Sequence, residues 1–323
     1  MFAPLEIVSG STDNTVRVWD VATGVCVQVL AGHSGRVTSV CALGGGRIVS
    51  GSDDHTVRVW DAATGFCVFV LNEHAFSVTS VCVLEVGYIV SGSNDHTLRV
   101  WDATTGFCVK TLVGHLGRVS SVCALGNGRI VSGSDDNTLK VWDIATGVCV
   151  RMLAGYSRSV NSVCALEDGR IVSGSDDNTL WVWDSSAGVS VRVLEGHIKS
   201  LIGLWVLSNR NIVSLTDDHT LSVWDAATGV CLEICKRESS RGSELTDSRL
   251  PQQYMRLGGA VAEWYAFIRN SSYYFAPPET LPLYLCGEAV GCIFTTLPSG
   301  TRNVSVFTIT GAVHTLEFIK PVL

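Results

Sequence analysis

GRIVSGSDDHTVRVWD occupies residues 46–61, and near-copies of this stretch recur along the chain. Its closing Trp-Asp pair returns every 41 residues, at Trp19-Asp20, Trp60-Asp61, Trp101-Asp102, Trp142-Asp143, Trp183-Asp184 and Trp224-Asp225. A fixed period in this range indicates a repeat architecture, whose units pack mainly against their neighbours. Within a unit, alternating runs such as VTSVCA (37–42) and FCVFVL (66–71) are separated by Gly, Asp and Asn clusters. Each unit is therefore expected to form four short β-strands.

The pattern around these pairs resembles the WD-repeat β-propellers. After Trp-Asp come Ala-Thr-Gly, a Cys/Val strand and Gly-His, and the resemblance covers about residues 5 to 236. It implies an all-β propeller in which sheets pack radially and ring closure protects their edges. We expect seven blades; eight is the alternative, because Trp264 lies 40 residues after Trp224.

The two ends of the chain depart from the repeat. Residues 1–236 are expected to hold the repeat blades, and the first blade lacks its innermost strand. Residues 237–280 form an irregular insert or a decayed repeat, and residues 281–323 form a degenerate last blade. Either the missing strand comes from the C-terminal part, with residues 251–275 as the apolar candidate, or the chain begins inside a longer product.

Composition excludes several classes of function. Only 16% of residues are charged and the formal net charge is -7, which argues against binding to nucleic acid or to anionic membranes. No apolar run reaches the length of a membrane span. Nine of the twelve cysteines occupy two repeat columns and no Cys-x-x-Cys pair occurs, so we expect reduced core thiols, no metal and no cofactor. A cytoplasmic location is expected, with the nucleus as alternative.

The resemblance implies one hydrogen-bonded His, Ser, Asp and Trp set per blade. The sequence supplies four such sets: His33, Ser50, Asp54 and Trp60; His74, Ser91, Asp95 and Trp101; His115, Ser132, Asp136 and Trp142; His197, Ser214, Asp218 and Trp224. A hydrolase would need one exposed nucleophile with an oxyanion hole, whereas these sets repeat. We therefore expect a structural role and no enzyme. Tyr156 replaces the histidine in one blade, which leaves that set in doubt, and Trp181 is expected to pack between blades.

By analogy with the family, the first polar residue of each turn points to the rim around the central channel. This column reads Asp53, Asn94, Asp135, Asp176 and Asp217. Arg36, Arg118, Phe76 and the column of Thr38, Thr79, Ser120, Asn161 and Ile202 are expected beside it. One interpretation is a solvated rim in which the two arginines offset the aspartates. The other is a docking face for a peptide that carries Lys or Arg, with Phe76 as an apolar anchor.

The expected function is a non-catalytic scaffold that docks partner proteins or peptides on this rim. The repeat pattern is most similar to the propellers of F-box substrate receptors, so a substrate-recognition subunit of a ubiquitin ligase is one alternative. A decayed structural array without a dedicated ligand is another.

Overall fold

The computed structural model describes residues 6–20, 25–84, 87–194, 196–197, 199–206, 211–217 and 220–235, and five strands between residues 265 and 317. The described regular elements are all β-strands, which confirms the expected all-β class. None of the described residues belongs to a helix that could cross a lipid bilayer.

The repeat region forms one three-stranded sheet followed by five four-stranded sheets, all antiparallel. The three-stranded sheet holds β1 (Glu6–Gly10), β2 (Thr15–Asp20) and β3 (Cys26–Ala31). The next two sheets hold β4 (Val37–Leu43), β5 (Arg47–Ser52), β6 (Val57–Asp61) and β7 (Cys67–Leu71), then β8 (Val78–Leu84), β9 (Tyr88–Ser93), β10 (Leu98–Asp102) and β11 (Cys108–Leu112).

The remaining repeat sheets continue the same order. They hold β12 (Val119–Gly126), β13 (Arg129–Ser134), β14 (Thr138–Asp143) and β15 (Val148–Ala154); β16 (Val160–Ala165), β17 (Arg170–Ser175), β18 (Leu180–Asp184) and β19 (Val189–Leu194); and β20 (Leu201–Val206), β21 (Asn211–Thr216), β22 (Leu221–Asp225) and β23 (Cys231–Cys235).

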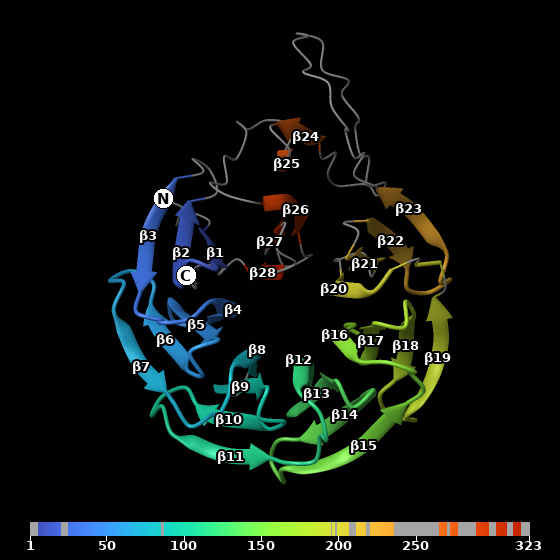
Figure 1. The fold of residues 1–323 in the computed structure, drawn as a ribbon, viewed down its shortest axis with the longest axis horizontal. Coiled ribbons are helices and arrows are strands. Elements are labelled where there is room, and N and C mark those ends of the chain that lie inside the picture. The colour runs from blue at the N-terminus through green and yellow to red at the C-terminus, as the bar shows by residue number, and fades with distance from the viewer. Residues whose placement is uncertain are drawn as a thin grey trace.

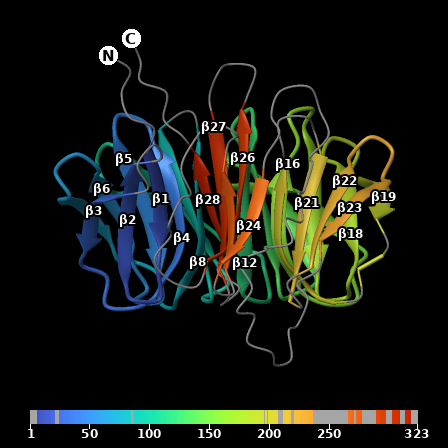
Figure 2. The same ribbon diagram turned by 90° about the horizontal axis from the view of Figure 1, so that it is seen from above.

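The sheets stand side by side around a ring (Figure 1). Each complete sheet begins at its innermost strand, as in β4, and ends at its outermost strand, as in β7. Figure 2 shows that the strands run between two faces of the ring, so the connecting turns gather on those faces. This is the blade arrangement expected of a propeller. The total number of blades stays a prediction.

The hydrophobic core lies between neighbouring sheets. Val57, Val59 and Leu71 of one sheet pack with Val78 and Trp101 of the next, and all five are at most 3% exposed. The same contact recurs between the following sheets. Burying one such side chain contributes on the order of 1.5 to 3 kcal/mol, so adjacent sheets stabilise one another.

The C-terminal strands lie between the first and last repeat sheets in the ring (Figure 1). The strands β24 (Tyr265–Arg269) and β25 (Ser272–Ala276) form a hairpin, and β26 (Ala289–Thr296), β27 (Arg302–Thr308) and β28 (Val313–Glu317) form a three-stranded sheet. β28 contacts β1 and β4, on the side where the first sheet lacks an inner strand. The sequence favoured residues 251–275 for that place. The described strands of that segment lie farther from the centre instead (Figure 1).

Candidate functional site

The expected hydrogen-bonded set comes together in the sheet β4–β7. His33 lies in the loop before β4, with Nδ1 2.8 Å from Asp54 Oδ2 and Nε2 2.8 Å from Ser50 Oγ. Trp60 Nε1 donates to the same hydroxyl at 2.8 Å. Two strands, the turn between them and the entering loop are thereby tied together beneath the surface.

Two further sets repeat this geometry, and a fourth is described in part. His74 and His115 each bond an aspartate at 2.7 Å and a serine hydroxyl at 2.7 to 2.8 Å, using Asp95, Ser91, Asp136 and Ser132. His197 Nε2 lies 2.7 Å from Ser214 Oγ, to which Trp224 donates at 2.9 Å. Asp218 lies outside the described residues.

The pKa values of Asp54 and His33 are shifted by burial and by hydrogen bonds within the set. Burial by itself raises the pKa of Asp54, but hydrogen bonds from Thr56, His33 and Ser34 outweigh it and hold the pKa at about 2. Burial lowers the pKa of His33 despite its aspartate partner. Ser50 is 0% exposed, so a substrate could not reach its hydroxyl. The geometry therefore supports stability rather than nucleophilic catalysis.

The set that contains Tyr156 is built differently. The phenol oxygen lies 2.7 Å from Ser173 Oγ and 2.8 Å from the Ser173 carbonyl oxygen. Trp183 donates to Ser173 Oγ at 2.8 Å, as in the other blades. Asp177 accepts the backbone amide of Ser157, as Asp54 accepts that of Ser34. Trp181 stacks on Trp183 at 5.0 Å between ring centroids, and it packs against a cluster that spans two sheets.

The cysteine columns lie within the packed sheets. All nine cysteines whose side chains are described are free thiols. Burial raises the pKa of Cys82 and of Cys164, which disfavours the reactive thiolate. Within the described part of the chain, no group of three or more His, Cys, Asp or Glu residues is arranged to hold a metal ion.

One position in the rim turns is occupied by His in some blades and by Asn in others, and its backbone conformation explains why both occur. The φ angles of this column lie between 65° and 71°, at Asn14, His55, His96, Asn137 and Asn178. Asn and His tolerate this left-handed region better than most residues. The turns hold the neighbouring rim residues in place.

We define the rim surface as the first polar residue of each of these turns together with the two or three residues that lead into each inner strand. Backbone hydrogen bonds join the two columns: the amides of Asp53, Asn94, Asp135, Asp176 and Asp217 donate to the carbonyls of Arg36, Ser77, Arg118, Ser159 and Ser200 at 2.9 to 3.1 Å. The fold thus fixes the rim backbone and leaves the side chains to vary from blade to blade.

Three carboxylates of the rim surface already have partners within their own blade, and two of these partners are arginines. Arg36 Nε lies 3.0 Å from Asp53 Oδ2, and Arg118 Nε lies 2.9 Å from Asp135 Oδ2. Asn161 Nδ2 donates to Asp176 Oδ1. The rim is therefore less acidic than its aspartate column indicates.

Apolar side chains also stand on this face. Phe76 is 57% exposed in the loop before β8, and its ring centroid lies 6.2 Å from that of His55 in the preceding blade. Leu116, in the loop before β12, is 86% exposed. The column of Phe76 holds Gly35, Gly117, Arg158 and Lys199 in other blades, and that of Leu116 holds Ser34, Ala75, Ser157 and Ile198. The repeat therefore needs neither apolar side chain.

Sequence reasoning missed the role of the column that begins at Thr38. Thr38 Oγ1 lies 2.6 Å from the carbonyl oxygen of Val78, which belongs to the next sheet. Thr79, Ser120 and Asn161 make the equivalent bonds to Val119, Val160 and Leu201. These residues join adjacent sheets rather than presenting a docking surface. Their spacing in the repeat was the available signal, but only the ring geometry shows what they reach.

Comparison with known proteins agrees with this architecture. Residues 4–20, 24–61, 65–102, 106–143, 147–184 and 188–225 match the family model described as WD domain, G-beta repeat.

Three curated proteins illustrate the similarity. The chain is 65% identical over 34 residues to WD repeat-containing protein pop1 of Schizosaccharomyces pombe, covering 10% of this chain and 4% of that protein. It is 51% identical over 41 residues to nuclear distribution protein PAC1-2 of Uncinocarpus reesii, covering 13% and 9%. It is 50% identical over 38 residues to F-box/WD repeat-containing protein 7 of Drosophila melanogaster, covering 12% and 3%. These matches span a small part of each relative.

Proposed function

Because the chain belongs to the WD-repeat family, whose members are generally non-catalytic scaffolds that bind other proteins, we propose that its rim surface docks partner proteins. The rigidity of the rim backbone supports this proposal. Backbone bonds hold successive rim residues in register, so a partner meets a preformed surface and loses less conformational entropy on binding.

The observation that carries the proposal is the exposure of Phe76 and Leu116. Large apolar side chains on an open surface mark interaction sites when the fold does not require them, and aromatic residues are favoured as binding anchors. Both lie in loops that enter neighbouring blades, where the equivalent positions vary between small, basic and apolar residues from unit to unit. A partner that covers both would bury apolar area from two blades at once.

The charge pattern makes an apolar anchor a better candidate than a basic peptide. Arg36 and Arg118 already neutralise Asp53 and Asp135, so a peptide carrying Lys or Arg would have to displace an existing partner at each. We therefore place the anchor at Phe76 and Leu116. The free thiols support a reducing compartment, and we place the protein in the cytoplasm on that basis.

A ubiquitin-ligase substrate receptor is the second candidate. It is supported by the match to a protein named F-box/WD repeat-containing protein 7, which covers 12% of this chain. Recovery of ubiquitin-ligase subunits together with the chain would favour it. Recovery of no defined partner would favour a structural array without a dedicated ligand.

The test is affinity purification of the full chain followed by mass spectrometry, with Phe76→Ser and Leu116→Ser combined. The matched control combines Phe66→Ser and Phe107→Ser, because both phenylalanines are 74% exposed and lie beside outer strands away from the rim. We expect partners to be lost from the rim variant alone, at an unchanged melting temperature. Retention of every partner by the rim variant would contradict the proposal.

A second arm separates charge from apolar contact. Asp53, Asp135, Asp176 and Asp217 are replaced together by Asn. Loss of partners from this variant alone would restore the basic-peptide interpretation of the rim surface.

A further inference from the structure

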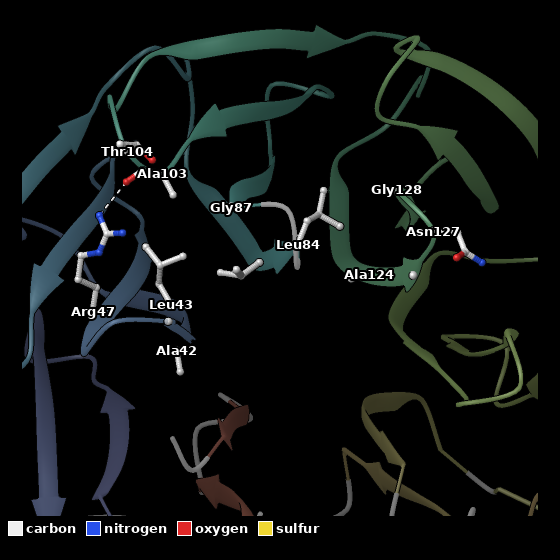
Figure 3. A pocket seen from close by; sticks show the side chains of 13 residues that line it. Ala42, Leu43, Arg47, Leu84, Gly87, Ala103, Thr104, Ala124, Asn127 and Gly128 are labelled. Carbon is white, nitrogen blue, oxygen red and sulfur yellow. Dashed lines mark hydrogen bonds between the residues drawn. The ribbon is translucent and has the colours of Figure 1, made fainter. Parts of the chain in front are cut away.

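A second candidate site lies at the other end of the inner strands. Described residues at the ends of β4, β8 and β12 and at the starts of the strands that follow them surround a cavity of about 830 Å³, which we call the turn pocket. Its apolar wall comes from three successive sheets and includes Leu43, Val83, Leu84 and Ala124, some of which are labelled in Figure 3. Pockets of roughly 300 to 1,000 Å³ accommodate small ligands or the side chains of a peptide.

Arg47 is the one charged residue among the described residues that line the turn pocket. Its Nη1 donates to the carbonyl oxygen of Ala103 at 2.8 Å, as the dashed line in Figure 3 shows. A guanidinium carries five N–H donors, so this bond fixes the group and leaves further donors available. In the described part of the chain, Arg47 forms an ion pair with no carboxylate.

Another repeat of the chain shows how an arginine at this position can bind a carboxylate. Arg170 occupies the position of Arg47 three repeats later, and its Nη1 donates to the carbonyl oxygen of Ala226 at 3.2 Å. Arg170 also has a carboxylate partner: its Nη2 lies 2.9 Å from Asp168 Oδ2, and its Nε donates to the same group. An arginine at this position can therefore hold its carbonyl bond and a carboxylate together.

The turn of Arg47 does not supply that carboxylate. Gly45 stands at the position of Asp168, in the run Gly44-Gly45-Gly46. A Cβ atom added at any of these three glycines would meet no other atom of the described residues within 4 Å. Gly45 therefore leaves room beside Arg47, at the place where Asp168 lies beside Arg170, and an acidic group of another molecule could enter it.

We propose that the turn pocket binds an acidic segment of a partner protein, which places an aliphatic side chain against Leu43, Leu84 and Ala124 and its neighbouring carboxylate on Arg47. The apolar wall and the single guanidinium select these two groups together. This site lies on the opposite face of the ring from the rim surface, so the scaffold could bind one partner on each face.

The experiment measures binding of short fluorescent peptides to the full chain. The probe has a central Leu-Glu pair in a Gly/Ser background, with Leu-Gln and Ser-Glu peptides as matched probes. We expect the Leu-Glu peptide to bind about tenfold or more tightly than either, because a hydrogen bond to a charged group and a buried side chain are each worth at least that factor. Equal binding of the three probes, or binding of none, would overturn the proposal.

Variants then locate the site. Arg47→Gln should weaken the Leu-Glu peptide to the level of Leu-Gln, whereas Arg170→Gln should leave its affinity unchanged. Thr104→Glu serves if Arg47→Gln folds poorly, since Thr104 is exposed at the pocket and a new carboxylate there would compete for Arg47. Unchanged affinity in Arg47→Gln or in Thr104→Glu would refute the site. The Phe76→Ser and Leu116→Ser variant should bind the probe normally, so failure at one surface is distinguishable from failure at the other.

Discussion

Trp181 lies with its ring centroid 5.2 Å from that of Tyr156, and the planes of the two rings are inclined by 54°. The first stands where the four preceding blades carry Arg or Lys, and the second replaces the histidine of the other complete blades. In the sheet β4–β7 the corresponding pair is Arg58 and His33, with the guanidinium 5.8 Å from the ring of Trp60. Because the two rings are in contact, Tyr156 and Trp181 replace the usual His and Arg pair together and form a single altered packing arrangement beside Trp183.

Tyr156→His should destabilise the protein when it is made alone. The sequence by itself favours a neutral or stabilising effect, because the change restores the repeat. The structure alters this expectation: histidine would give up aromatic contacts worth about 1 kcal/mol and leave space beside Trp181. Adding Trp181→Arg should recover part of the loss. Urea unfolding of both single variants and the double variant measures the coupling, and strictly additive losses would contradict a joint packing change.

Trp142→Ala should cost about 3 to 5 kcal/mol of unfolding free energy. Trp142 is 1% exposed, and its indole donates to Ser132 Oγ at 2.9 Å, so the change leaves both a cavity and a buried group with one partner fewer. The control is Trp181→Ala, because Trp181 is only partly buried and should cost less. Wild-type stability of Trp142→Ala in urea would show that this set contributes little.

Acidification should unfold the protein through the His and Asp pairs. The pKa of Asp54 is held at about 2, below its ordinary value of 3.8, so its contribution is present in full above about pH 4 and is lost as the pH falls toward 2. The pKa of His33 is also lowered, so its contribution is lost as the pH falls below about 6.5. Both effects reduce stability in acid. Urea midpoints between pH 7 and pH 3 should fall less steeply in Asp54→Asn, and an equal slope would refute the assignment.

Thr79→Val should cost about 1 to 2 kcal/mol although it conserves the shape of the side chain. Thr79 Oγ1 lies 2.9 Å from the carbonyl oxygen of Gly92 and also reaches that of Val119 in the next sheet. The change leaves a buried carbonyl without this donor. Thr111→Val, at an exposed position of the outer strand β11, should stay within about 0.5 kcal/mol of wild type. Equal thermal shifts for the two variants would show that the link between sheets is unimportant.

The 41-residue period was sufficient to predict the strands and their succession in each unit, and the resemblance to the WD-repeat propellers implied the His, Ser, Asp and Trp contacts. The strands and their succession are local, so they follow from the periodicity of the sequence. The order of the strands around the centre also follows, because each unit repeats the same connections.

Contacts between units were harder to predict. Thr38 is expected beside the rim because it lies where an inner strand begins, and only the curvature of the ring brings its hydroxyl to Val78. The turn pocket was missed because it needs turns from three separate units, although Gly45 in the place of Asp168 is visible in the sequence. The position of β28 beside β1 depends on contacts outside the repeat, which carry no periodic signal.

The links between sheets have constant separations along the chain. Thr38 reaches a residue 40 positions ahead, the amide of Val81 donates to Ser39 42 positions behind, and Arg47 reaches Ala103 56 positions ahead. A gene that gains or loses one whole unit of 41 codons would therefore keep a correct partner for each of these bonds. A deletion of a single codon would shift several of them at once. Such a chain can change its length in whole units, and so can add or remove partner-binding positions without redesigning the junctions between them.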